Sequence, residues 1–380
     1  MRPLPHFPDY HVAKPPAAKR WLGTMALLVL FAGAGIALLR GANTGVGIIL
    51  AGMLSTMLFI SFCWLFSLLY YRFSVHHSAT WQQEVAEVHN HWWYQHRRHF
   101  SLQDVVLIGP AGAERVDWLR LLQREQKPPV ERQEANGLAL RVARIFSPDV
   151  SEREHQLVRM LVLQWKNQRE GKKLTSPQRC FWLGSESAWQ VFSDQAMKSF
   201  PGITLPATPE FWQGENTLSG IAAALSADEN GTEYLIAGCQ SEPASSQAQR
   251  AAGEAAVLWL AGSDGPVMLS RGEFYDPCAT ESLEQVCERA QRQSELDAPP
   301  DACMLFSHPE QPALAVSGWN MTHHLQDNYW GYTGKLDALI VISLAAIYAQ
   351  SQSQSCGWIA TDFLHPLALG IVKPHGNQQG

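Results

Sequence analysis

Two long apolar runs dominate the pattern of hydrophobic and polar positions at the start of the chain. Trp21 to Leu39 is a stretch of 19 residues without a charged side chain, and Val46 to Tyr70 is another of 25. Each can cross a hydrocarbon core about 30 Å thick at about 1.5 Å per residue. A signal peptide followed by a buried helix is the alternative, but the second run is too long for a globular core. The pattern therefore predicts a transmembrane hairpin over residues 21–71.

The turn between the two runs, residues 40–45, is short, so the two helices are expected to be antiparallel neighbours. Small residues at 32–35, together with Gly47 and Gly52, would let their backbones approach closely. Basic residues lie mainly in the two segments that flank the hairpin: the N-tail has four, the segment after the hairpin has Arg72, Arg97 and Arg98, and the turn has one. The positive-inside rule then predicts an inner-membrane protein of bacterial type, with its N-terminus and large C-terminal domain in the cytoplasm. Seven Cys residues without a CxxC pair agree with a reducing compartment.

The segments that flank the hairpin have distinct compositions. Residues 1–20 contain five prolines and are predicted to form an extended, mobile N-tail. Residues 72–100 form a juxtamembrane connector that is rich in histidine, tryptophan and arginine. Because no Cys and no matching acidic ligand accompany the histidines, we predict no metal site there. We predict instead an interfacial helix, although this helix could equally pack against the soluble domain. The predicted membrane-interface residues are Trp21, Trp92, Trp93, Tyr94, Arg97 and Arg98.

From residue 101 onward, short β-rich runs alternate with helical patterns, which predicts an α/β sheet with helices on its faces. The strands are expected at 105–109, 138–146, 181–183, 234–238, 254–260, 267–270, 304–306, 313–316, 358–359 and 367–372. The helices are expected at 113–123, 151–170, 186–198, 218–227, 281–292 and 336–348. The segment 201–214 looks like a loop, and Ser151 to Glu154 resembles a capping box. The apolar helix at 336–348 is expected to lie between layers.

Charge and motifs exclude several functions. The net charge is −6, and residues 1–72 carry +5, so the remainder carries −11. An acidic domain argues against nucleic acid as a partner. No GxGxxG, GxxxxGK[ST] or HExxH motif is present, and we predict no cofactor or metal. Gly184–Ser187 lacks the last glycine of a nucleophile elbow, and His323, His324 and Asp327 would need an unidentified serine. Asp362 and His365 are interpreted as turn residues before Pro366.

Three segments of the domain resemble the thiolase and β-ketoacyl synthase superfamily. Residues 218–227 and 234–239 are similar to the buried helix and strand that follow the nucleophilic cysteine of these enzymes. Gly253–Leu258 resembles their GEGAAALVL motif, and Asn328–Gly334 resembles the N-x-x-GHT segment before a long buried helix. The resemblance implies a layered, thiolase-like α/β domain of two related halves, an N-terminal half at 101–250 and a C-terminal half at 251–380.

The catalytic residues of the superfamily do not carry over to this chain. The cysteine is expected near Gly214–Thr217, where the sequence is Gly–Glu–Asn–Thr, and Tyr332 stands in place of the histidine. A phenol does not act as a near-neutral acid or base as imidazole does. We therefore predict a pseudoenzyme without catalytic residues. Its vestigial active-site region comprises Asn216, Thr217, Gly331, Tyr332, Thr333 and Gly334.

A membrane hairpin followed by a thiolase-like domain without its nucleophile is similar to the adaptor family encoded beside type VI secretion phospholipase effectors. This resemblance implies a non-catalytic adaptor or chaperone, which binds such an effector in the producing cell and hands it to the secretion spike protein. The alternative is an active acyl-transferring or lipid-modifying membrane enzyme with a rearranged site around His323, His324, Tyr332 and Cys356. A third option is a membrane scaffold without a client, and the sequence leaves a homodimer open.

Overall fold

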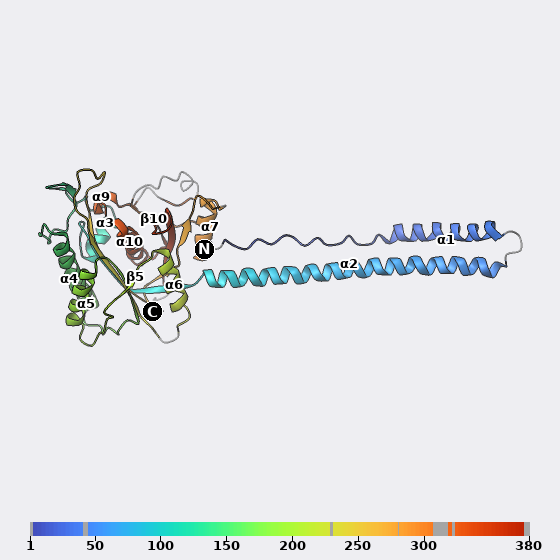
Figure 1. The fold of residues 1–380 in the computed structure, drawn as a ribbon, viewed down its shortest axis with the longest axis horizontal. Helices are drawn as coiled ribbons and strands as arrows, with labels where there is room; N and C mark the ends of the chain where they lie inside the picture. The colour runs from blue at the N-terminus through green and yellow to red at the C-terminus, as the bar shows by residue number, and fades with distance from the viewer. Residues whose placement is uncertain are drawn as a thin grey trace. The chain divides into compact units, whose positions relative to one another are not determined.

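The computed structural model describes residues 3–40, 45–228, 231–279, 281–306, 318–320 and 324–375. The chain divides into two compact units, residues 2–92 and residues 93–380, which are described separately (Figure 1).

The first unit consists of an extended tail and two helices, α1 (Ala18–Arg40) and α2 (Val46–His96). Both helices are long and apolar enough to cross a membrane. They contact each other through small residues, as predicted, because a Cβ on Gly33 would meet Met53 and a Cβ on Gly52 would meet Ile36. Gly35 and Gly47 have no such neighbour within 4 Å, so only part of the predicted small-residue surface is used.

The N-tail is extended, as predicted, but it is held against α2 rather than left unattached. The amide of Ala13 donates to Ser74 Oγ at 2.9 Å, and Trp81 Nε1 donates to the carbonyl of Pro8 at 3.2 Å. Further along, His89 Nε2 lies 2.9 Å from the carbonyl of Pro5. The tail therefore runs antiparallel to α2, and its extended form spans about 25 Å over eight residues, close to the roughly 22 Å that the helix rises from 74 to 89.

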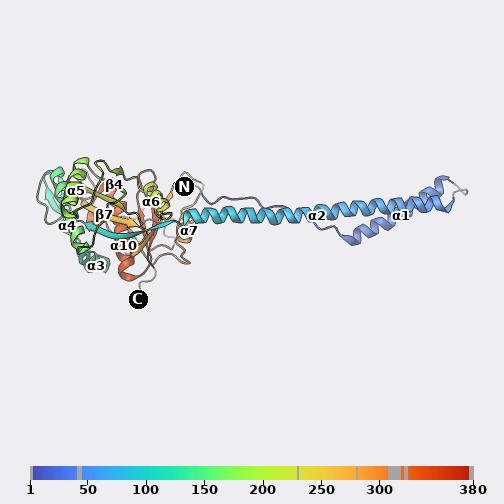
Figure 2. The ribbon, with the colours of Figure 1, turned by 90° about the horizontal axis from the view of Figure 1, so that it is seen from below.

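The juxtamembrane connector is the continuation of α2, which runs without a break from Val46 to His96 (Figure 2). Trp92 lies 22 residues after Tyr70, which is about 33 Å further along a continuous helix. The interfacial position of Trp92 and the residues after it stays a prediction. Arg97 lies 5.4 Å from the Trp93 ring and pairs with Glu295 at 3.8 Å, so this end of the connector contacts the soluble domain.

The second unit is a mixed α/β domain built around one large sheet, together with a small two-stranded hairpin. The strands are β1 (His99–Ile108), β2 (Arg132–Glu134), β3 (Gly137–Ala139), β4 (Arg179–Leu183), β5 (Glu210–Phe211), β6 (Tyr234–Ser241), β7 (Glu254–Gly262), β8 (Val267–Ser270), β9 (Glu273–Tyr275), β10 (Ala302–Leu305), β11 (His324–Leu325), β12 (Cys356–Ala360) and β13 (Leu367–Pro374). The helices are α3 (Arg115–Leu122), α4 (Val150–Arg169), α5 (Glu186–Ser199), α6 (Glu215–Leu225), α7 (Leu283–Gln293), α9 (Asp327–Trp330), the 3₁₀ turn η1 (Gly334–Leu336) and α10 (Asp337–Gln352).

The order of the strands shows that the domain consists of two related halves. The sheet runs β11-β10-β12-β13-β8-β1-β7-β6-β4-β5. One half contains β1, β4, β5, β6 and β7, and the other contains β8, β10, β11, β12 and β13. If the strands of each half are numbered 1 to 5 along the chain, both halves have the order 3-2-4-5-1 from the outer edge of the sheet to its centre. The halves join where β1 pairs antiparallel with β8. The strand β7 lies between β6 and β1, so the first set of five strands ends at Gly262, whereas the predicted boundary between the halves fell at residue 250.

Three apolar clusters define five layers. Alternate residues of each strand face opposite sides of the sheet. On β4, Phe181 and Leu183 face the central cluster with α6 and α10, whereas Cys180 and Trp182 face α4 and α5. On the C-terminal half, Cys303 of β10 and its neighbours pack instead against α7. The layers are therefore α4 and α5, the first half-sheet, α6 and α10, the second half-sheet, and α7.

The central position of α10 explains its composition. Gly334–Gln352 is also long and apolar enough to cross a membrane, but two thirds of its most apolar stretch is buried inside the domain. A helix that is apolar on every side belongs either in a core or in a bilayer. The prediction that this helix lies between layers is thus confirmed.

Several local predictions differ from the structure. Residues 140–146 do not continue the strand that begins at β3; instead the amide of Val142 donates to Glu254 Oε1 at 2.6 Å. Asp149, rather than Ser151, caps α4 by accepting from the amide of Glu152. The two-residue strand β5 lies within the predicted loop at 201–214. The strand expected at 313–316 lies outside the described residues.

Candidate functional site

The position expected for a nucleophile is the start of α6, and the structure leaves no space there for a side chain. Gly214 precedes the helix with φ +63°, a conformation that favours glycine. A Cβ at this position would lie 2.0 Å from Oδ1 of Asp362 and 3.2 Å from Cδ2 of Phe363. None of the three nearest atoms is a sulfur, so the described residues place no thiol against this point.

The carboxylate of Asp362 occupies the place in front of the helix. Its Oδ1 accepts from the amide of Glu215 at 3.1 Å, and its Oδ2 accepts from the amide of Leu364 at 3.2 Å. The Asp362 amide in turn donates to the carbonyl of His365 at 3.2 Å, which confirms the predicted turn. An anion at a helix N-terminus satisfies free amides and complements the helix dipole. Asp362 therefore stabilises α6 at the point where the enzymes would carry their cysteine.

Phe363 closes the same region from the side. Its ring meets Phe211 edge-on at 5.8 Å between centroids, and Lys335 Nζ lies 4.9 Å from its centroid. Because Phe363 also lies against Gly214, it links the start of α6 to the segment that follows Gly334. Sequence analysis did not identify Phe363 or Lys335, since neither belongs to a motif.

A buried charged cluster lies behind the start of α6. Glu215 is 3% exposed, and a Cβ on Gly272 would lie 3.2 Å from its Cγ. Burial raises the pKa of Glu215 to about 8, and the nearby positive charge of Arg271 opposes this shift. Within the described part of the chain, Oε1 of Glu215 and Nε of Arg271 are buried without a hydrogen-bond partner. The cluster can therefore hold a proton at neutral pH, but it contains no nucleophile.

The residues of the vestigial active-site region lie at the start of α6 and in the segment between α9 and α10. Asn216 is exposed, while Thr217 is buried and its Oγ1 accepts from the amide of Gln213 at 2.8 Å. Tyr332 is 49% exposed, and its main chain pairs with Ala251 and Gly253. The conformations of the segment explain its glycines, because Gly331 has φ +70° and Gly334 has φ +58°. Thr333 Oγ1 donates to Asp337, next to the start of α10. These contacts are structural.

The described residues of the alternative enzyme hypothesis lie on different elements, and the hypothesis stays a prediction. Cys356 is fully buried in β12, and its thiol donates to the carbonyl of Gly357 at 3.4 Å. His324 lies on β11, where its ring meets that of Tyr348 at 5.8 Å. The strand β10 lies between β11 and β12, so about 10 Å separates their backbones. His323 lies outside the described residues.

The glutamate of the Gly253–Leu258 motif has a structural role. Glu254 is fully buried, and both of its carboxylate oxygens accept hydrogen bonds from the guanidinium of Arg153 at 2.7–2.8 Å. Ser241 Oγ donates to Glu254 Oε2 at 3.0 Å, in addition to the Val142 bond described above. One carboxylate thus joins α4, β6, β7 and the chain after β3.

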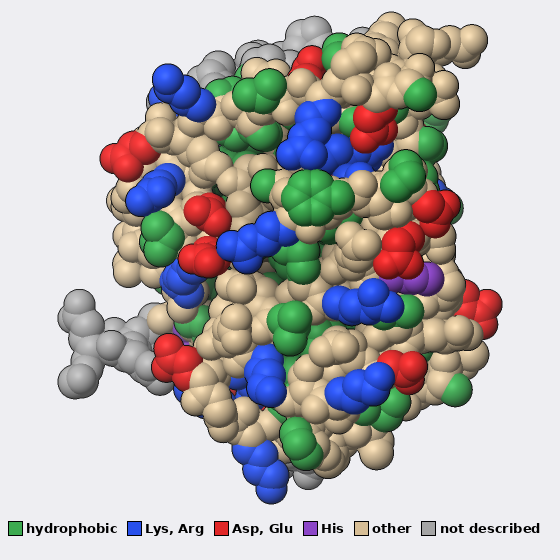
Figure 3. Space-filling model, turned by 90° about the vertical axis from the view of Figure 1, so that its left-hand side faces the viewer, with side chains coloured by type: hydrophobic (Ala, Val, Ile, Leu, Met, Phe, Trp, Pro, Cys, Tyr) green, Lys and Arg blue, Asp and Glu red, His purple; other side chains and the backbone are tan. Residues whose placement is uncertain are grey.

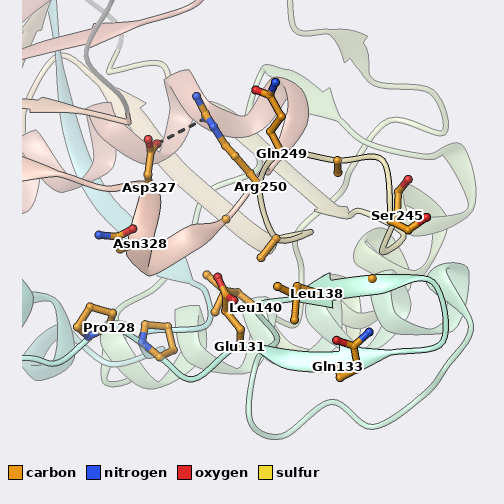
Figure 4. Close-up of a pocket in the computed structure, with 16 residues that line it drawn as sticks. Pro128, Glu131, Gln133, Leu138, Leu140, Ser245, Gln249, Arg250, Asp327 and Asn328 are labelled. Carbon is orange, nitrogen blue, oxygen red and sulfur yellow. Dashed lines mark ion pairs between the residues drawn. The ribbon is translucent and has the colours of Figure 1, made fainter.

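A groove of about 700 Å³ lies beside the vestigial segment (Figure 4). Its walls come from the β2–β3 hairpin, the loop at 245–251 and the start of α9. Arg250 and Asp327 face each other across 3.5 Å at one side, and Glu131 and Gln133 lie on the other. Gly137 lets the hairpin approach the loop closely, because a Cβ there would lie 2.6 Å from the carbonyl of Ser245. No motif in the sequence pointed to this groove.

The surface seen in Figure 3 shows no broad field of one charge sign. Lys, Arg, Asp and Glu side chains alternate there with apolar ones. This face thus offers no extended basic surface of the kind that phosphate backbones require.

No protein-family model matches the sequence, and no curated protein matches it either. Solved structures do match. The ishigamide ketosynthase/chain length factor has a TM-score of 0.50 at 14% identity, over 73% of this chain and all of that one. The ketosynthase from module 1 of the bacillaene synthase of Bacillus amyloliquefaciens FZB42 has a TM-score of 0.50 at 10% identity, over 74% of this chain and 77% of that one. The soluble domain therefore has a thiolase-like fold, as predicted.

Proposed function

We propose that the protein is a membrane-anchored, non-catalytic adaptor on a thiolase-like scaffold. The observation that supports the proposal is the start of α6, near which the resemblance places the nucleophile and where Asp362 lies against Gly214. A cysteine nucleophile must present its sulfur to an acyl carbonyl, and this position has neither the sulfur nor the room. A scaffold that keeps its core but loses its reactive group is suited to binding rather than turnover.

The partners in this proposal come from the sequence resemblance to type VI secretion adaptors. The client is a phospholipase-type effector in the producing cell, and the recipient is the secretion spike protein. The two N-terminal helices support the membrane tether, since both are long and apolar enough to span a bilayer. In this proposal the domain lies in the cytoplasm and the tether is in the inner membrane.

The non-catalytic part is tested with an acyl-thioester probe on the full-length protein. We expect no covalent labelling of the wild type and none of Gly214→Cys, because Asp362 would still block the new thiol. The double variant Gly214→Cys, Asp362→Gly is the control that shows whether the probe reaches this point. Labelling of the wild type that disappears in Cys356→Ala would contradict the proposal and favour acyl transfer.

The adaptor part is tested by co-producing the tagged protein with a phospholipase-type effector and with a secretion spike protein. We expect both to be recovered with the adaptor after solubilisation in mild detergent. Recovery of the tagged protein with neither of them would refute this assignment.

A further inference from the structure

The β2–β3 hairpin has one edge that is fully paired and one that is open. Ala135 and Asn136 form the two-residue turn, so Glu134 and Gly137 exchange the two hydrogen bonds that close the hairpin. The pair Gln133 and Leu138 is therefore of the non-hydrogen-bonded kind, and the backbone groups of both residues point away from each other.

The contacts of β3 confirm this assignment. The carbonyl of Leu138 accepts from the amide of Ala252 at 2.9 Å, and the amide of Leu140 donates to the carbonyl of Ala252 at 2.8 Å. Beyond Ala252, Gly253 pairs with Tyr332. β2, β3, the segment around Ala252 and the segment around Tyr332 are therefore hydrogen-bonded side by side in this order. Among the described residues, nothing pairs with the outer edge of β2, where the N–H and C=O of Gln133 are directed.

The hairpin is held rigidly although it projects from the large sheet. Arg141 is 6% exposed, and its guanidinium makes two parallel hydrogen bonds of 2.8 Å to the carboxylate of Glu134. The same guanidinium donates to the carbonyl of Glu242 at 2.8 Å. A bidentate pair of this kind fixes both position and orientation. An extended ligand would therefore find the edge already in the conformation it needs.

The groove adjoins this edge. Gln133 and Leu138 are cross-strand neighbours that both line the groove, so a strand added beside β2 would direct alternate side chains over it. Glu131 also lines the groove and takes part in no ion pair within the described part of the chain. Arg250 and Asp327, the other charged residues of the lining, are paired with each other. The charge that the groove presents to a ligand is therefore negative and lies next to the open edge.

We propose that the open edge of β2 binds an extended segment of the partner protein by strand addition, with a Lys or Arg of that segment directed to Glu131. Main-chain pairing supplies affinity in such complexes, and side-chain pockets supply specificity. The inference rests on the proposed adaptor function, because the partner segment belongs to the effector.

The test measures binding of the co-produced effector to the full-length protein in detergent. In Gln133→Pro the outward N–H is removed without touching the hydrogen bonds of the hairpin, and proline is tolerated at such edge positions. Gln133→Ala is the matched control, since it changes the side chain and keeps the N–H. We expect about a tenfold loss of affinity for Gln133→Pro and for Glu131→Lys, and less than a twofold change for Gln133→Ala.

The possible outcomes separate the two proposals. Wild-type affinity in Gln133→Pro, or an equal loss in Gln133→Ala, would overturn strand addition and leave the adaptor function standing. Absence of effector binding by the wild type would overturn both. If Gln133→Pro changed only the oligomeric state, the edge would bind a second copy of this chain instead, and the inference would be wrong. Unchanged thermal unfolding of each variant ensures that the comparison concerns binding.

Discussion

Asp362 shows how a side chain that is distant in sequence can stabilise the start of a helix. It lies 147 residues after Glu215 in sequence, yet its carboxylate receives the first amide of α6. An apolar side chain there would leave an amide of the helix N-terminus without an acceptor. In the proposed non-catalytic adaptor, this carboxylate keeps α6 stable without a cysteine at its start.

Glu215 gives a prediction for the dependence of stability on pH. Its pKa is raised from 4.5 to about 8 in the folded state, so the folded protein holds a proton that the unfolded chain releases. Folding stability contributed by this proton therefore falls as the pH rises from about 4.5 to 8. We expect Glu215→Gln to remove this fall and to raise the free energy of unfolding at pH 8 by on the order of 2–4 kcal/mol relative to wild type.

Urea unfolding followed by tryptophan fluorescence between pH 5 and pH 8.5 measures this effect. Asp337→Asn is a useful control, because burial raises the pKa of Asp337 only to about 6. The fall in folding stability that Asp337 causes should therefore end near pH 6, below the pH at which the fall caused by Glu215 ends. A Glu215→Gln protein with the same pH dependence as wild type would show that Glu215 is ionised in the fold.

Among the elements, α4 contains a buried ion pair in its first turn. Arg153 opens the helix with a guanidinium that is 6% exposed and binds the fully buried Glu254. Removing Arg153 leaves the buried Glu254 with Arg141, at 3.8 Å, as its remaining ion-pair partner, and this longer contact does not replace the lost hydrogen bonds. We expect Arg153→Ala to lower the free energy of unfolding by about 3–5 kcal/mol, measured by urea unfolding.

Arg292→Ala is the matched control for this prediction. It is also a helical arginine paired with a glutamate, but Arg292 and Glu288 are 59% and 54% exposed. Exposed pairs contribute less than about 1 kcal/mol. Equal losses in the two variants would mean that the buried pair contributes no more than a surface pair.

Periodicity predicted most of the elements because the core determines them. The apolar run at 336–348 and the strand at 267–270 are buried and were identified correctly. The error at 140–146 has a different cause, since alternation there reflects contacts with Glu254 and not a sheet ladder. β5 and the β2–β3 hairpin are only two or three residues long, which is too short for a periodic signal.

At the candidate site, the sequence predicted which residue type is absent but not which residues lie there. The absence of cysteine near 214–217 was visible in the sequence, but the residues that fill the space come from 362–363 and 335. Their proximity arises from the return of β13 beside β12 and from η1, and no local pattern encodes it. Motif reasoning recognises what an enzyme family keeps and cannot locate what replaces it.

For the whole molecule, Cys278 offers a direct test of the proposed membrane topology. It is the exposed one of the seven cysteines, all of which are described. If the large domain is cytoplasmic, a membrane-impermeant maleimide should not label Cys278 in intact spheroplasts and should label it after permeabilisation. Asn43→Cys, in the turn of the hairpin, should be labelled in intact spheroplasts. Labelling of Cys278 in intact spheroplasts would mean that the large domain lies outside the cytoplasm, which contradicts the proposed topology.

The pairing of β1 with β8 at the centre of the sheet limits how this protein can be truncated. Four consecutive residue pairs cross it, from His99 with Ser270 to Leu102 with Val267. Cutting the chain after Gly262 would strip both central strands of a neighbour and turn each into an aggregation-prone border. Truncation therefore cannot tell which half recognises a client; that assignment has to come from single substitutions in the intact chain.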